Sequence, residues 1–240
     1  MNLVLDIGNT RVKYGVFDHK NLLSHGVIEA KNLSTGFEGL IKKYPQCTRA
    51  LLCQVGPTPE ADLIPIKRKM EVIFMSADLS FPVKNNYQSP NTLGFDRLAL
   101  ASAARVQYPG KAVLVIDCGT CVTYDFIEAN GAYNGGAISP GLSMRYKAMN
   151  AYTKALPELK AEVPLGWYGA TTETSMHHGA FFGLVHEING FVNQYRRYNA
   201  DLTTILTGGD LEILRDHIKN DIFAHPNFLL LGLNEILLIN

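Results

Sequence analysis

The pattern of apolar and polar positions that opens the chain occurs a second time near its middle. Residues 2–10 read NLVLDIGNT and residues 112–120 read AVLVIDCGT. Each segment is an apolar run followed by an aspartate, one further residue, a glycine and a small polar residue. This pattern predicts a buried strand that ends in a tight turn. We therefore expect a duplicated chain.

Both copies continue with residues that favour β-structure. Such residues fill 12–17 and 122–127 and end at polar turns, which predicts a hairpin at the start of each half. Helical periodicity comes later, in residues 35–44, 58–70, 96–107, 143–156, 173–198 and 210–220. Strands before helices, twice over, predict an α/β fold of two lobes with a cleft between them as the natural place for a ligand.

The boundary between the lobes is expected near Tyr108-Pro109-Gly110. A helical pattern stops there at a Pro-Gly break, just before the second apolar run begins. The predicted lobes are residues 1–109 and residues 110–240.

Composition and charge narrow the range of partners. Lysine plus arginine and aspartate plus glutamate number 22 each, so no net field attracts nucleic acid or an anionic membrane. No basic stretch precedes the first apolar run, as a signal peptide requires, and the apolar run 228–239 is too short to span a bilayer. We expect a cytoplasmic protein with a small-molecule partner.

The four cysteines are Cys47, Cys53, Cys118 and Cys121. The last two form a CxxC pair, but no second CxxC or CxxH completes a tetrahedral zinc site. This count favours buried or incidental thiols in a reducing compartment over a metal or redox site.

Candidate chemistry gathers at the repeated turns. Glycine lets backbone N–H groups approach phosphate oxygens, a neighbouring hydroxyl or amide donates a further bond, and the aspartate can hold a cation. The first loop, residues 6–10, continues to Arg11 and Lys13, which add positive charge. Alone it could equally be a hairpin turn whose polar side chains satisfy only the backbone. The matching residues Asp117, Gly119 and Thr120, with Thr123 just beyond, favour phosphate binding.

A third element is the segment 203–210, which reads TTILTGGD. It predicts a short strand, a Gly-Gly turn and the start of a helix. Such a turn can lie against a nucleobase or a ribose, but a Gly-Gly pair more often only forms the turn between two elements.

With these three elements, the chain resembles the superfamily of acetate and sugar kinases, heat-shock chaperone ATPases and actin. That superfamily shares a duplicated ribonuclease-H-like fold with two phosphate loops and a later Gly-Gly at the adenosine. The resemblance implies ATP binding and leaves the substrate open.

Further motifs resemble one family, the type III pantothenate kinases. They are Tyr87, the segment GFDR at 94–97, the segment GGAISPG at 135–141, and GATT at 169–172. Together with the two phosphate loops and the Gly-Gly, the resemblance extends over nearly the whole chain. It implies ATP-dependent phosphorylation of pantothenate, the first step of coenzyme A biosynthesis. It also implies a homodimer, with residues 135–141 in its interface, although from sequence alone these residues could equally form an internal loop.

The resemblance also implies roles for particular residues. Asp96 would accept the proton of the pantothenate hydroxyl. The pocket for pantothenate would be lined by Tyr87, Gly94, Phe95, Asp96, Arg97 and Thr172. ATP would be bound by Asp6, Ile7, Gly8, Asn9, Thr10, Arg11, Val12, Lys13 and Thr120. Asp117 would ligate a monovalent cation, K⁺ or NH₄⁺, and Mg²⁺ would accompany the nucleotide.

Several alternatives stay open at this stage. Asp96 could serve only to cap a helix, and Arg97 could be an ordinary surface ion-pair partner. Cys121 stands where relatives commonly have a smaller residue, which puts details of the second loop in doubt. The chain could also be another phosphotransferase or a phosphohydrolase of the same superfamily, or a non-catalytic regulator. Intact Asp6, Asp96 and Asp117 favour catalysis.

Overall fold

The computed structural model describes residues 1–8, 10–54, 56 and 58–240, and the chain forms two compact units. The first unit comprises residues 1–109, 131–133 and 227–240, and the second comprises residues 110–130 and 134–226. The division after Pro109 lies where the Pro-Gly break was expected. Residues 131–133 and 227–240, by contrast, belong to the first unit rather than to the expected C-terminal lobe.

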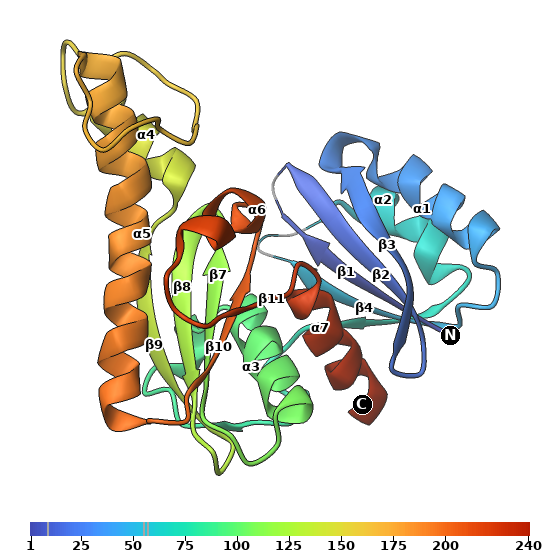
Figure 1. Ribbon diagram of the computed structural model, residues 1–240. Helices are drawn as coiled ribbons and strands as arrows, with labels where there is room; N and C mark the ends of the chain where they lie inside the picture. The colour runs from blue at the N-terminus through green and yellow to red at the C-terminus, as the bar shows by residue number, and fades with distance from the viewer. Residues whose placement is uncertain (9, 55, 57) are drawn as a thin grey trace. The chain divides into compact units, whose positions relative to one another are not determined.

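The sheet of the first unit has five strands in the order β3-β2-β1-β4-β5 (Figure 1). The strands are β1 (Asn2–Ile7), β2 (Arg11–Asp18), β3 (Asn21–Glu29), β4 (Arg49–Gln54) and β5 (Glu71–Phe74). The first three form an antiparallel meander, as the hairpin pattern predicts, whereas β4 runs parallel to β1 and β5 parallel to β4. Sequence reasoning had not identified β4 and β5.

The second sheet repeats this order. Its strands are β7 (Val113–Cys118), β8 (Cys121–Ile127), β9 (Ala132–Pro140), β10 (Thr203–Thr207), β11 (Phe223–Ala224) and the two-residue β6 (Lys84–Asn85). They lie in the order β11-β10-β7-β8-β9-β6, so β9, β8, β7, β10 and β11 correspond in turn to β3, β2, β1, β4 and β5. The extra strand β6 pairs with the first two residues of β9. The repeat seen in the sequence is therefore a repeat of topology.

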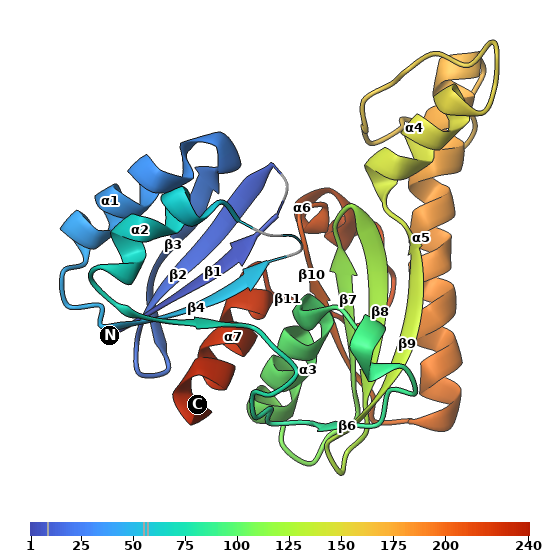
Figure 2. The same cartoon turned by 180° about the vertical axis from the view of Figure 1, so that it is seen from behind.

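Along the chain, helices follow the corresponding strands in both halves, and among the described residues the second half has one additional helix. In the first half they are α1 (Leu33–Lys43), α2 (Glu60–Lys67) and α3 (Phe95–Gln107), with short 3₁₀ turns at Ala30–Asn32 and Pro90–Thr92. In the second half they are α4 (Leu142–Ala151), α5 (Thr172–Tyr198), α6 (Leu211–Leu214) and α7 (Phe228–Ile239), with a 3₁₀ turn at Arg215–His217. Seen from behind in Figure 2, α1 and α2 lie together beside the first sheet.

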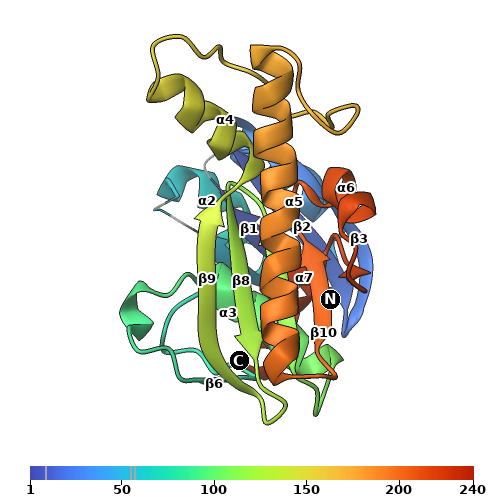
Figure 3. The ribbon, with the colours of Figure 1, turned by 60° about the vertical axis from the view of Figure 1, so that its left-hand side comes forward.

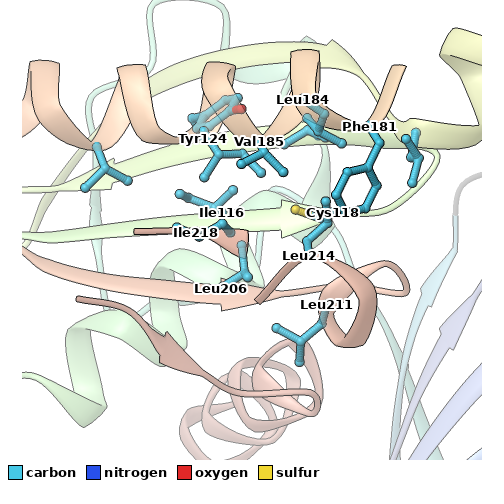
Figure 4. Close-up of a cluster of buried hydrophobic side chains, with 14 of the residues drawn as sticks. Ile116, Cys118, Tyr124, Phe181, Leu184, Val185, Leu206, Leu211, Leu214 and Ile218 are labelled. Atoms are coloured by element: carbon cyan, nitrogen blue, oxygen red, sulfur yellow. The ribbon is translucent and has the colours of Figure 1, made fainter. Parts of the chain in front are cut away.

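Each unit has its own apolar core on one face of its sheet. In the first, Leu3, Leu5 and Ile7 of β1 pack with residues of α1 and α2, including Phe37 and Ile66. In the second, the corresponding positions of β7 pack against α5, which lies along β8, β9 and β10 (Figure 3). Figure 4 shows Ile116 and Cys118 beside Phe181, Leu184 and Val185 of that helix. Because side chains alternate along a strand, Asp6 and Asp117 lie on the opposite faces from these cores.

The apolar run 228–239 is the helix α7, which packs on α3 and β1 in the first unit. A Cβ at Gly232 would lie 1.8 Å from the carbonyl oxygen of Ala99, so only glycine permits this approach. The buried Asn234 donates to the backbone oxygen of His19 (2.8 Å) and accepts from Asn2 (3.1 Å). Asn234, which interrupts the apolar run, thus hydrogen-bonds α7 to the rest of the first unit. Among the described residues, no helix is long and apolar enough to cross a membrane.

Candidate active site

The first loop joins β1 to β2 in a tight turn. The N–H of Gly8 donates to the backbone oxygen of Arg11 at 3.1 Å, and Asp6 pairs across the strands with Lys13. The side chains of Ile7 and Val12 belong to the apolar core, so they offer a ligand no side-chain contact. Thr10 and Arg11 are exposed, and Asn9 lies outside the described residues.

The carboxyl ends of β1 and β4 hold Asp6 beside Cys53, since these two residues are paired in the parallel ladder. Burial raises the pKa of Asp6 to about 6; the positive charge of Lys13 opposes this rise, and the charge of Asp96 adds to it. Burial also raises the pKa of the Cys53 thiol, and the negative charges of Asp6 and Asp96 raise it further. The structure therefore brings together two carboxylates that are far apart in the sequence.

Asp96 lies in the first turn of α3, the helix whose N-cap residue is Gly94. Its Oδ1 accepts a hydrogen bond at 2.9 Å from the N–H of Arg97, which is one of the first-turn N–H groups that have no partner within the helix. A Cβ at Gly94 would lie 2.3 Å from this same oxygen. The glycine of the GFDR motif thus leaves room for the carboxylate.

Arg97 is not a surface ion-pair residue. It is 5% exposed, and its guanidinium carbon lies 5.6 Å from the centre of the Tyr87 ring. Tyr87 in turn stacks on Tyr133, with ring centres 6.3 Å apart. Because a cation over an aromatic face is held in place by the ring's negative face, Tyr87 and Arg97 form one group at the start of α3. Phe95, beside them, is half-buried.

The second loop is built around Asp117 at the end of β7. Asp117 pairs with Thr123 on β8 and with Thr207 on β10, which places two threonines beside it on neighbouring strands. Gly208 follows Thr207 with a φ of +103°, and a Cβ there would lie 2.4 Å from Oδ1 of Asp117. The first glycine of the Gly-Gly turn is therefore needed for both its conformation and its small size.

Three segments of the second unit meet at Gly119 and Thr120. The N–H of Gly119 donates to Cys121 O at 3.0 Å, and the N–H of Gly141 donates to Thr120 O at 3.1 Å. The N–H of Asp210 donates to Cys118 O at 3.0 Å. Burial raises the pKa of the Asp210 carboxyl. Cys121 takes part in the loop through its backbone oxygen.

The segment 135–141 is anchored by Glu187 of α5. Glu187 accepts hydrogen bonds from Tyr124 (2.8 Å) and Ser139 (3.0 Å) and forms an ion pair with Arg145. Arg145 also donates through Nε to Pro140 O at 3.0 Å. These contacts fix the backbone immediately before Gly141, and so they hold the segment that bonds to Thr120. Sequence reasoning did not identify Glu187 or Arg145, because single charged residues in helices carry no motif.

Glycines in the same segment permit close packing within the second unit. A Cβ at Gly136 would lie 1.7 Å from Tyr124 O, and one at Gly141 would lie 2.1 Å from Gly119 O. The internal-loop interpretation of this motif therefore has direct support.

The remaining predicted residue, Thr172, is exposed at the first position of α5 in the second unit, next to the capping box formed by Thr171 and Thr174. Tyr87, Asp96 and Arg97 all belong to the first unit. On the same helix, His177 is buried with Nδ1 2.9 Å from the Tyr146 hydroxyl.

Comparison with known proteins decides the family. The model of the type III pantothenate kinase family matches residues 2–194. The chain belongs to this family. A type III pantothenate kinase of Christiangramia forsetii is 44% identical over 241 residues, covering 100% of this chain and 99% of the relative. One of Flavobacterium johnsoniae is 41% identical over 235 residues, covering 98% and 96%.

Solved structures confirm the fold. A Baf family protein of Campylobacter jejuni, described as a transcriptional activator, has a TM-score of 0.63 at 21% identity and covers 98% of this chain and 96% of its own. A ROK family glucokinase of Streptomyces griseus has a TM-score of 0.53 at 12% identity, with 98% of each chain covered. At these identities the likeness concerns the fold alone. The expected duplicated ribonuclease-H-like fold is confirmed.

Proposed function

We propose that this protein transfers the γ-phosphoryl group of ATP to the primary hydroxyl of pantothenate, as the first step of coenzyme A biosynthesis. The observation that carries the proposal is the group at the start of α3, where a carboxylate, a buried guanidinium and an aromatic ring come together. Membership of the type III pantothenate kinase family supports it.

Asp96 accepts the proton in this proposal. The hydroxyl oxygen forms a bond to the γ-phosphorus, the bond from that phosphorus to the bridging oxygen of ADP breaks, and the hydroxyl proton passes to the Asp96 carboxylate. Arg97 offers planar donors for the carboxylate of pantothenate, and Tyr87 keeps the guanidinium in place. Gly94, Phe95 and Thr172 complete the proposed set of pantothenate-binding residues.

The first loop and Thr120 are proposed to bind ATP. The N–H of Gly8 is taken by the backbone oxygen of Arg11, so among the described residues of the first loop the proposed phosphate donors are the side chains of Thr10, Arg11 and Lys13. The hydroxyl of Thr120 is proposed as a further donor. Phosphoryl transfer depends on positioning and charge stabilisation more than on covalent chemistry, which fits a site that offers cationic and hydroxyl side chains.

Two cations fit the residues that are present. Asp6 supplies hard carboxylate oxygens of the kind Mg²⁺ takes together with phosphates, and burial raises its pKa, so a bound cation would offset the cost of burying its charge. Asp117 lies between two threonine-bearing strands, a setting of oxygen donors that suits K⁺ or NH₄⁺. Bound cations would neutralise the charge that phosphates and carboxylates bring together.

A homodimer is part of the proposal. Between α4 and α5, large side chains are left in solvent: Tyr152 is 89% exposed, Leu165 92%, Trp167 87% and Tyr168 61%. Exposed apolar side chains gathered on one segment mark interaction sites. Light scattering should give twice the chain mass for the native protein, and a Leu165→Ser/Trp167→Ser variant should shift toward the monomer.

We further propose that the protein acts in the cytoplasm, where its four cysteines stay reduced.

A screen of acceptor substrates tests the proposed activity. Purified protein in K⁺ buffer with Mg²⁺ and ATP is offered pantothenate, glucose, acetate or no acceptor, and the phosphorylated products are measured. We expect product with pantothenate alone. Product with a sugar or acetate instead, or ATP hydrolysis that no acceptor changes, would assign the chain to another phosphotransferase or to a phosphohydrolase. In the same assay, replacement of K⁺ by Na⁺ should lower the rate, and a rate independent of the cation would remove the role of Asp117.

A further inference from the structure

A hollow of about 360 Å³ lies in the second unit, next to the second loop. Its walls come from three separate segments: Gly119 and Thr120 of the loop, Gly209 and Asp210 after β10, and Ser143, Met144 and Lys147 of α4. The first two segments were singled out from the sequence as candidate nucleotide-binding elements, but α4 was not. The helix α4 therefore contributes lining residues that do not belong to either candidate nucleotide-binding segment.

The face of α4 that lines the hollow differs from its other faces. Leu142 and Tyr146 are buried in the core of the unit, and Arg145 is engaged with Glu187. Lys147 is one turn beyond Ser143, so both lie on the same side of the helix. No carboxylate of a described residue forms an ion pair with Lys147, whose side chain is exposed. Its charge is available to a ligand.

The electrostatic setting of the hollow favours an anion. The N-terminal end of a helix carries partial positive charge, because its first N–H groups have no partner within the helix. Ser143 and Met144 belong to this first turn of α4, and Gly141 directs its own N–H to the loop at Thr120. Thr120 adds a hydroxyl donor. Asp210, the one carboxylate among the described residues that line the hollow, opposes an anion, so the cationic side chain of Lys147 is what favours one.

We propose that Lys147 is a nucleotide-binding residue whose ammonium group contacts the phosphate chain of ATP in this hollow. The inference rests on the proposed function and adds a cation from α4 to the loops already described. A lysine without a ligand would be a solvated surface charge with no effect on nucleotide affinity, so the two interpretations make different predictions.

The test is nucleotide binding measured by isothermal titration calorimetry on the full chain. Lys147→Gln should weaken ATP and ADP about ten-fold, the order expected for one charge-assisted hydrogen bond, and should leave adenosine unchanged. Lys147→Arg should restore most of the affinity. Lys111→Gln is the matched control, because Lys111 is an exposed lysine of the same unit at the opposite end of β7.

The outcomes separate this inference from the proposed function. If the native protein binds ATP and Lys147→Gln binds it within two-fold of the native affinity, the role of Lys147 is lost and the kinase proposal stands. An equal loss for ATP and adenosine would likewise overturn the phosphate contact. If the native protein binds no ATP, the proposed function falls, and this role falls with it.

Discussion

The carboxylates of Asp6 and Asp96 lie close enough that the charge of Asp96 contributes to the raised pKa of Asp6. Asp6 ends a strand and Asp96 begins a helix, and both belong to the first unit. Alternation along β1 turns Asp6 away from the core formed with α1 and α2. A candidate phosphate loop and a candidate general base are thus neighbours within one compact unit.

Asp96→Asn is the sharpest test of the general base. The amide is nearly the same size but cannot accept the hydroxyl proton, so turnover with pantothenate should fall by about 10²–10⁴ while ATP still binds. Steady-state rates and ATP titration measure the two effects separately. Asp78→Asn, an exposed aspartate of the same unit, is the control and should retain full activity. Undiminished turnover by Asp96→Asn would remove the assignment.

The pKa of Asp6 gives stability a defined pH dependence. Folding raises this pKa from 3.8 to about 6, so the folded state binds the proton more tightly than the unfolded state. The contribution is fully present below pH 3.8 and is lost as pH rises through 6. Asp6→Asn should therefore be more stable than the native protein above pH 6. We expect a difference of about 2 kcal/mol, which is less than the full effect of the pKa shift because Asp6 is partly exposed and keeps some of its hydration.

Urea denaturation at pH 4, 5, 6 and 7 without Mg²⁺ or nucleotide measures this difference. The difference in stability between the native protein and Asp6→Asn should be smallest at pH 4, grow as the pH rises to 6, and stay nearly constant above pH 6. A constant difference across the range would show that Asp6 has an ordinary pKa. Added Mg²⁺ and ATP should reduce the advantage of Asp6→Asn, because only the native carboxylate gains from a bound cation.

Gly208→Ala tests the geometry at Asp117. The added Cβ would lie 2.4 Å from Oδ1 of Asp117 on a backbone with φ of +103°, so the carboxylate must move. We expect the activation by K⁺ to be lost and the rate to fall at least ten-fold. Gly110→Ala is matched for backbone strain, since Gly110 has a φ of +75°, yet a Cβ there meets no atom of the described chain within 4 Å. Equal effects of both variants would assign the loss to strain alone.

Glu187→Gln tests the anchor of the segment 135–141. The amide keeps its shape but leaves the partly buried Arg145 without its counter-charge, which should lower the free energy of unfolding by about 1–3 kcal/mol. Because the segment bonds to Thr120, we also expect KM for ATP to rise while KM for pantothenate changes little. Glu173→Gln, at the exposed start of the same helix, should change stability by well under 1 kcal/mol. An unchanged KM for ATP would limit Glu187 to a structural role.

The repeat, the hairpins and most helices could be predicted because each leaves a periodic signal in the chain. Thus α5 begins at Thr172 and ends at Tyr198, close to the predicted 173–198. The strands β4 and β5 were missed because they are short apolar runs, which periodicity cannot separate from other buried segments. No helix was predicted at 228–239, and the expected lobe 110–240 includes these residues, whereas α7 packs on α3 and β1 of the first unit, which are distant from it in the sequence.

In the candidate site, too, residues that lie in sequence motifs could be predicted and isolated residues could not. Motifs with glycine and aspartate at fixed spacing identified Asp6, Asp96 and Asp117. Cys53 and Lys147 were not found, since a lone cysteine or lysine becomes meaningful only when the fold brings it beside such a loop.

The most direct test of the account is ADP formation by the purified protein in K⁺ buffer with Mg²⁺ and ATP, measured with and without pantothenate. We predict that pantothenate raises the rate at least about a hundred-fold and that each ADP is matched by one 4′-phosphopantothenate. A rate that pantothenate does not change would contradict it.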